Sequence, residues 1–181
     1  MNDLFPYPLR PGQDGIIRLI RDSVRGGRCV VLESGTGTGK TSVSLAGALE
    51  GISGTARKVV FLTRTKSQQK QVAVEARAIG ARTDVICIAV QGRGPATCPM
   101  MLSDRDLSDG TSEELSKLCA ELKKGTGPAG KCSYFENIGS TEVEACISFI
   151  RARHPDPEEF RDFCVARGCL LYTSDAADDR I

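Results

Sequence analysis

The chain has 181 residues, of which 40% are hydrophobic and 26% are charged, as in ordinary globular proteins. Its formal net charge of +1 excludes a uniformly basic protein, so any contact with nucleic acid has to come from a local patch. No apolar run is long enough to span a bilayer, and no signal peptide opens the chain, so we expect a cytoplasmic protein that does not bind membranes.

The first predicted element is a helix that follows a proline-rich lead-in over residues 1–12. Four apolar residues recur at helical spacing before Gly26 and Gly27 end the helix: Ile16, Ile17, Ile20 and Val24. Gln13 lies where the lead-in meets this helix, close to Arg10. A glutamine amide can donate to and accept from an adenine edge. An exposed glutamine at a helix start is the alternative interpretation.

The next segment reads as a strand, a phosphate-binding loop and a helix. The apolar run 29–33 enters the sequence Ser34-Gly-Thr-Gly-Thr-Gly-Lys-Thr41, and an alternating apolar segment follows. Glycines with positive φ let backbone N–H groups surround a phosphate at the start of a helix. Lys40 would bind the β- and γ-phosphates, and Thr41 would bind Mg²⁺. Ser34 stands where the strict pattern has glycine, and a plain glycine turn is the alternative.

Two further apolar runs, 58–63 and 85–90, flank a helix predicted over residues 69–79. Strands that alternate with helices predict a parallel sheet with ligands at the carboxyl ends of its strands. Polar and basic residues follow these ends: Thr63, Arg64, Thr65, Lys66 and Arg93. Such a patch suits a nucleic-acid backbone, although a solvated basic face explains the same charges.

After Arg93 the sequence predicts short helices and no further strand. Capping boxes start two of them, at 111–114 and 141–144, and Gly168 stops the last. In the second of these helices four residues are expected to face inward: Val143, Cys146, Ile147 and Ile150. Few aromatic residues anchor this region, so a metal or cluster would supplement its core.

The eight cysteines are more easily explained as ligands or core residues than as disulfides in a reducing compartment. Cys29 and Cys87 fall in predicted core strands. Cys98 and Cys132 lie where thiolates can converge. The remaining positions on apolar helix faces favour the core: Cys119, Cys146 and Cys164. The absence of C-x-x-C spacing argues against zinc.

Five motifs, in this order, resemble the XPD-type iron–sulfur helicases of superfamily 2, with archaeal XPD first and DinG-type relatives second. They are Arg10-Pro-Gly-Gln13, Glu33-Ser-Gly-Thr-Gly-Thr-Gly-Lys-Thr41, Phe61-Leu-Thr-Arg-Thr-Lys-Ser-Gln68, Gln91-Gly-Arg93 and the cysteines that follow. The resemblance covers residues 5–168. It implies a 5′→3′ ATP-dependent DNA helicase, expected to act in DNA repair as a monomer, with ATP, Mg²⁺, single-stranded DNA and a [4Fe–4S] cluster. The implied fold is α/β, with a RecA-like parallel sheet over residues 1–94 and a small, mostly α-helical iron–sulfur insert over residues 95–168.

The resemblance also implies roles for individual residues. Gln13 would read adenine, and Thr63, Arg64 and Thr65 would contact DNA together with Lys66 and Arg93. The expected nucleotide contacts are Arg10, Gln13, Ser34, Gly35, Thr36, Gly37, Thr38, Gly39, Lys40 and Thr41. Cys98, Cys119 and Cys132 match the first three cluster ligands, which for Cys119 replaces the core interpretation. Cys169 is the expected fourth ligand, and Cys164 or Cys146 are the alternatives.

The end of the chain departs from the family pattern. Cys169-Leu-Leu-Tyr-Thr-Ser-Asp-Ala-Ala-Asp178 looks like a translated sequencing adapter, so residues 169–181 are expected to be non-native. No Asp-Glu-x-His box follows a fourth predicted strand, so we expect the parent protein to be the enzyme and this chain to bind nucleotide without hydrolysing it. Two other classes remain open: a P-loop kinase or small GTPase-like switch, and a non-catalytic module that binds DNA or zinc.

Overall fold

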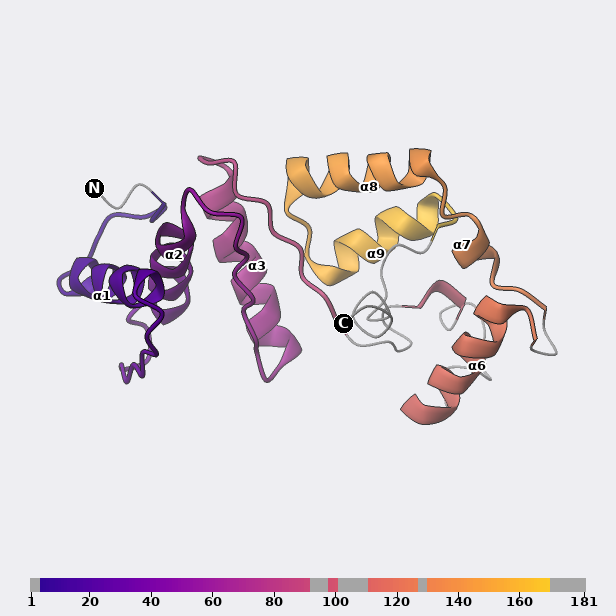
Figure 1. Ribbon diagram of the computed structural model, residues 1–181, viewed down its shortest axis with the longest axis horizontal. Helices are drawn as coiled ribbons and strands as arrows, with labels where there is room; N and C mark the ends of the chain where they lie inside the picture. Colours follow the sequence, from indigo (N-terminus) through magenta and orange to yellow (C-terminus); the bar gives the residue numbers. More distant parts are fainter. Residues whose placement is uncertain (1–3, 92–97, 101–110, 127–129, 170–181) are drawn as a thin grey trace. The chain divides into compact units, whose positions relative to one another are not determined.

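The computed structural model describes residues 4–91, 98–100, 111–126 and 130–169 of the chain (Figure 1). The chain divides into two compact units, residues 1–87 and 88–181. The first unit holds α1 (Gln13–Arg25), α2 (Lys40–Ile52) and α3 (Lys66–Gly80). The second holds α6 (Ser112–Lys124), α7 (Ser133–Glu136), α8 (Ser140–Arg153) and α9 (Pro157–Ala166).

In the first unit α1 packs along α2, and the contact is close because α2 presents glycines to it. A Cβ atom at Gly47 would lie 2.9 Å from the carbonyl oxygen of Ile17, and one at Gly51 would lie 2.7 Å from Cβ of Val24. Ile17, Phe5, Val43 and Ala46 form the core beside this contact. The predicted helix over Ile16 to Val24 is therefore confirmed, and its apolar stripe is what packs on α2.

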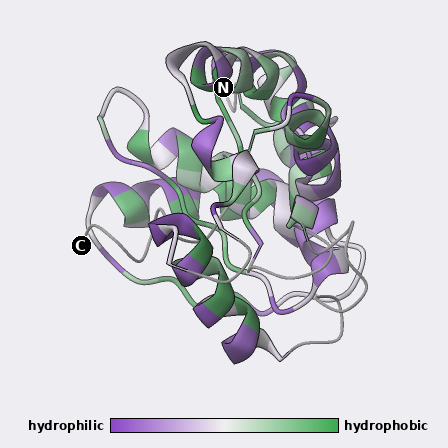
Figure 2. Ribbon diagram, turned by 90° about the vertical axis from the view of Figure 1, so that its right-hand side faces the viewer, coloured by the Kyte–Doolittle hydropathy of each residue, from purple (hydrophilic) through white to green (hydrophobic). Residues whose placement is uncertain are grey.

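The third helix begins earlier than its apolar pattern alone predicts. Thr65 caps it, because its hydroxyl accepts a hydrogen bond from the backbone N–H of Gln68 at 3.2 Å. Its buried face consists of Ala73, Glu75, Ala76 and Ile79. Several helices carry hydrophobic residues along one side and hydrophilic residues along the other (Figure 2).

The predicted parallel sheet is wrong. Across the described ranges no β-strand forms, and the runs 29–33, 58–63 and 85–90 have no ladder. Val31 is 99% exposed and Leu62 is 87% exposed, whereas a central strand would bury both. Cys29, expected in the core, is exposed as well. A local apolar run supplies only one side of each strand pair, and the hydrogen bonds of a parallel sheet join segments far apart in the sequence.

Capping and a small apolar core organise the second unit. The predicted capping box of α6 is confirmed, since Thr111 and Glu114 exchange hydrogen bonds. The box predicted at 141–144 is not formed, because α8 starts at Ser140 with Gly139 as its N-cap. Asp156 caps α9 instead, in a box that the sequence interpretation missed. Cys146, Phe160, Cys164 and Cys169 form the core between α8 and α9, whereas Ile147, predicted to face inward, is exposed.

Within the described residues, no helix has both the length and the hydropathy that a membrane span would need.

Candidate nucleotide site

The glycine-rich loop ends at the first turn of α2, as the sequence predicts. Gly37 and Gly39 have φ values of 75° and 80°, in the left-handed region that suits glycine. Gly35, for which the same conformation was expected, is not among the positive-φ glycines. Gly39 is the N-cap of α2, and no side chain caps this end or adds an acidic group to its first turn. The first N–H groups of α2 are therefore suited to an anion.

The side chains of the loop bond to the loop itself. Nζ of Lys40 donates to the carbonyl oxygens of Ser34 at 2.8 Å and Gly35 at 2.5 Å. The hydroxyl groups of Ser34 and Thr38 lie 2.7 Å apart, and Thr38 also donates to Gly35 O at 3.0 Å. Ser34, the departure from the strict pattern, thus helps to close the loop. Thr36 is exposed at the tip, and Thr41 is half-buried in the first turn of α2.

Two residues of the lead-in attach to this loop. Nη1 of Arg10 donates to Gly37 O at 3.0 Å, and Nε2 of Gln13 donates to Thr38 O at 2.9 Å. Oε1 of Gln13 accepts from the backbone N–H of Arg10 at 2.9 Å, and the Gln13 side chain is only 6% exposed. The exposed-glutamine interpretation is therefore wrong. Both ends of the amide are engaged with the protein, so Gln13 positions the loop in this conformation.

A buried carboxylate that the sequence analysis did not single out ties α2 to α3. Ser42, next to Thr41, donates to Oε2 of Glu75 at 2.7 Å, and Gln71 donates to Oε1 at 2.8 Å. Partial burial, followed by a hydrogen bond to Glu75, raises the pKa of the Tyr7 hydroxyl. One glutamate on a helix forms no motif that a sequence pattern can detect. The only indication that Glu75 bonds to α2 is its position on the buried face of α3.

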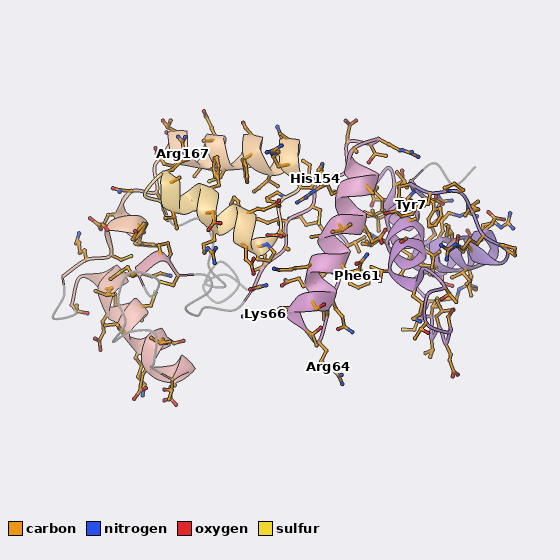
Figure 3. All side chains as sticks on the ribbon, turned by 180° about the vertical axis from the view of Figure 1, so that it is seen from behind. Tyr7, Phe61, Arg64, Lys66, His154 and Arg167 are labelled. Carbon is orange, nitrogen blue, oxygen red and sulfur yellow. The ribbon has the colours of Figure 1, made fainter. Side chains whose placement is uncertain are left out.

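The predicted nucleic-acid contacts lie at the start of α3. The side chains of Arg64 and Lys66 project outward there (Figure 3), and both residues are exposed. The backbone N–H of Arg64 donates to Oε1 of Gln68 at 3.2 Å. Thr63 donates weakly to Thr65 O at 3.4 Å. Arg93 lies outside the described residues, so the structure does not relate it to the other four.

Three of the predicted cluster ligands are buried around α6, and the backbone N–H of Cys132 donates to Leu122 O of this helix at 3.2 Å. Cys98 packs with Leu115 and Met100, Cys119 lies on α6, and Cys132 precedes α7. Cys169 instead lies with Cys146 and Cys164, and the three Sγ atoms are within 4.8 Å of one another. Burial, with Cys169 as a further contributor, raises the pKa of the Cys146 thiol to about 11. None of the eight cysteines, all of which are described, forms a disulfide.

Comparison with known proteins adds one family. The sequence model of the family described as type III restriction enzyme, res subunit, matches residues 6–109, which is more than half of the chain. The match contains residues 6–12 of the lead-in, the phosphate loop, α1, α2 and α3. No solved structure matches the chain.

Proposed function

Because the chain belongs to the type III restriction enzyme res subunit family, a helicase-like family of superfamily 2, we propose that it is the nucleotide-binding part of an ATP-dependent DNA helicase. The family is one of ATP-dependent nucleic-acid motors. The observation that supports a nucleotide role here is the loop 34–39, which leads into the uncapped N-terminus of α2 beside Lys40. XPD-like 5′→3′ polarity and a repair role are parts of the proposal that rest on the resemblance.

When the nucleotide binds, Lys40 exchanges its hydrogen bonds within the loop for contacts with phosphate. The Lys40 ammonium leaves the carbonyl oxygens of Ser34 and Gly35 and binds the β- and γ-phosphates. The N–H groups at the start of α2 donate to the same phosphates, and Thr41 offers its hydroxyl to Mg²⁺. A Cβ atom at Gly37 would meet nothing within 4 Å, so the tip of the loop has room for this approach.

Gln13 has to release the loop in order to read adenine. Its amide donates to Thr38 O and accepts from Arg10 in the conformation described above. We assign it both roles, in sequence: it fixes the loop before the nucleotide binds and pairs with the adenine edge afterwards. Arg10 donates to Gly37 O and keeps this hydrogen bond when the loop moves.

The proposed DNA contacts are coupled to the loop through α3. Thr63, Arg64, Thr65 and Lys66 precede or begin this helix, whose Glu75 accepts a hydrogen bond from Ser42 beside Thr41. A change at the start of α2 therefore reaches α3 through a buried, charge-assisted hydrogen bond. The DNA would be single-stranded and bound mainly through its phosphates.

The [4Fe–4S] cluster remains a proposal from the resemblance, and its donor set fits in part. Cys98, Cys119 and Cys132 are buried thiols, which suits thiolate ligation away from water. The expected fourth ligand, Cys169, has Cys146 and Cys164 as its neighbours. The nucleotide exchange described above does not depend on a cluster.

Binding of a fluorescent ATP analogue with Mg²⁺ tests the nucleotide site. Lys40→Ala should weaken binding at least about tenfold, since it removes a charge-assisted contact of about 1.5–3 kcal/mol. Lys117→Ala is the matched control, because Lys117 is exposed on α6 and pairs with Glu113. Equal affinities of Lys40→Ala and the unchanged chain would reject the site.

Filter binding to single-stranded DNA over a range of salt concentrations tests the patch at the start of α3. Arg64→Ala should reduce the slope of log affinity against log salt by about 0.7, the value for one lost phosphate contact on a single strand. Arg18→Ala removes the same charge from α1, where Arg18 pairs with Asp14, and should leave the slope unchanged. A slope unaffected by Arg64→Ala would remove this residue from the DNA interface.

A further inference from the structure

Three buried thiols meet between α8 and α9. Cys146 comes from α8, Cys164 from α9, and Cys169 from the turn that follows α9. Their side chains are 2%, 1% and 0% exposed. The Sγ atoms of Cys146 and Cys164 are 4.0 Å apart, and all three sulfur atoms lie within 4.8 Å of one another. Among the described residues, this is the set of histidine, cysteine and acidic side chains gathered closely enough for one ion.

A backbone turn after α9 places Cys169 beside Cys164 in the last turn of that helix. The N–H of Cys169 donates to Cys164 O at 3.1 Å, which brings the two residues to one turn. Gly168 has a φ of 63°, so the reversal uses the left-handed conformation that glycine adopts readily. Asn137 Nδ2 donates to Gly168 O at 3.1 Å and fixes the turn from outside the helix.

Aromatic rings of α8 and α9 pack beside the three cysteines. Phe149 on α8 stacks on Phe163 of α9 with ring centroids 4.1 Å apart, and Phe160 packs in the same core. Arg167 lies over the Phe163 ring at 5.8 Å and brings a positive charge to this end of α9. The three sulfur atoms are thus held by packing between the two helices and by the hydrogen bonds of the turn after α9.

The sulfur separations distinguish one ion from a cluster. Four thiolates around a single tetrahedral Zn²⁺ at about 2.3 Å place their sulfur atoms roughly 3.8 Å apart. The 4.0 Å pair and the 4.8 Å limit for all three are close to this value. In a [4Fe–4S] cluster each cysteine binds a different iron atom, so the sulfur atoms lie farther apart than around one ion. Thiolates select soft cations over Mg²⁺ or Ca²⁺.

We propose that Cys146, Cys164 and Cys169 bind one thiophilic divalent cation of the Zn²⁺ class, with the fourth position taken by water or an added thiol. The competing account is a dry core in which the cysteines act as small apolar side chains. The proposal assigns Cys169 to this site rather than to a cluster with Cys98, Cys119 and Cys132. It concerns the 181-residue chain, because Cys169 is the first residue of the segment expected to be non-native.

Titration of the full chain with Co²⁺ under reducing, oxygen-free conditions tests the proposal. Tetrahedral thiolate coordination gives a sulfur-to-cobalt charge-transfer band and visible d–d bands, which Zn²⁺ then removes by displacement. We expect one Co²⁺ per chain, and at least tenfold weaker binding in Cys146→Ser, Cys164→Ser and Cys169→Ser. Cys29→Ser and Cys87→Ser are the controls and should bind as the unchanged chain does.

Three results would overturn the site. The chain could take up neither Co²⁺ nor Zn²⁺, or the Co²⁺ spectrum could be lost in Cys132→Ser but kept in Cys164→Ser. The purified protein could also be brown, with iron and sulfide bound through Cys169. If the serine variants lose helical circular dichroism, the unchanged chain decides the question. Zn²⁺ should then raise its unfolding midpoint with increasing concentration, because a ligand of the folded state stabilises that state. A midpoint independent of Zn²⁺ would leave only the dry core.

Discussion

At the scale of single residues, Gln13 connects the lead-in to the phosphate loop through both ends of its amide. The two roles proposed for Gln13 predict different nucleotide selectivities. A glutamine that only supports the loop affects all nucleoside triphosphates alike, because the loop contacts phosphates. A glutamine that also pairs with the base discriminates adenine from guanine.

We predict that Gln13→Ala weakens ATP binding more than GTP binding. The expected change in the ratio of affinities is about 5- to 150-fold, corresponding to about 1–3 kcal/mol for hydrogen bonds to a base edge. Titrations of the purified chain with both nucleotides and Mg²⁺ measure it. If both affinities fall by the same factor, Gln13 supports the loop and does not read the base.

At the scale of elements, the close contact of α1 with α2 depends on Gly47 and Gly51. We predict that Gly47→Ala and Gly51→Ala each lower the free energy of unfolding by about 1–3 kcal/mol, as overpacking does elsewhere. The added methyl group would lie 2.9 Å from Ile17 O or 2.7 Å from Cβ of Val24. Urea denaturation followed by circular dichroism gives the values.

Gly15→Ala on α1 is the matched control for this contact. A Cβ atom there would meet nothing within 4 Å. Since alanine is the better helix former by about 0.5–1 kcal/mol, this variant should be equally or more stable. Destabilisation by Gly15→Ala comparable to that of Gly47→Ala would show that the loss does not come from the close contact of α1 with α2.

The capping box of α6 predicts a pH dependence with a definite sign. Hydrogen bonds from the backbone and side chain of Thr111 lower the pKa of Glu114. Because the folded-state pKa is depressed, the stabilisation is present above the ordinary carboxyl pKa and is lost as pH falls through the lowered value. Glu114→Gln should therefore be less stable than the unchanged chain near neutral pH, and the difference should shrink in acid.

Thermal unfolding between about pH 3 and pH 7, a window that brackets carboxyl titration, measures this dependence. Glu113→Gln is the control, because it removes a neighbouring carboxylate that pairs with Lys117 instead of the cap. A stability difference for Glu114→Gln that is constant across the window would contradict the prediction.

The sequence predicts features formed by residues close together in the chain better than features formed by residues far apart. The loop 34–39 and the α6 cap depend on neighbours within a few residues, and both were found from spacing. The sheet required pairing between the distant runs 29–33, 58–63 and 85–90, which no local pattern encodes. The Ser42–Glu75 bond and the meeting of Cys146 with Cys164 were missed for the same reason, because each joins residues from different helices.

At the scale of the whole molecule, large apolar residues in extended segments of the described chain face solvent. Val31, Val60 and Leu62 are 99%, 78% and 87% exposed. Monomeric proteins rarely present such segments without a charge or proline to protect them. These residues lie in the segments that lead to the loop and to α3, so their accessibility is a property of the candidate site itself.

Solvent-facing extended backbone is also what an endopeptidase binds, since the cleft of such an enzyme adds the substrate as a strand. Phe61 and Leu62 supply the large apolar side chains that a chymotrypsin-type protease accepts, and both are exposed. Brief digestion should therefore nick the chain first near these two residues, ahead of Phe160 in the core between α8 and α9, as mass spectrometry of the fragments can show. An intact 58–63 segment alongside early cuts in α9 would mean that this segment is sheltered in solution.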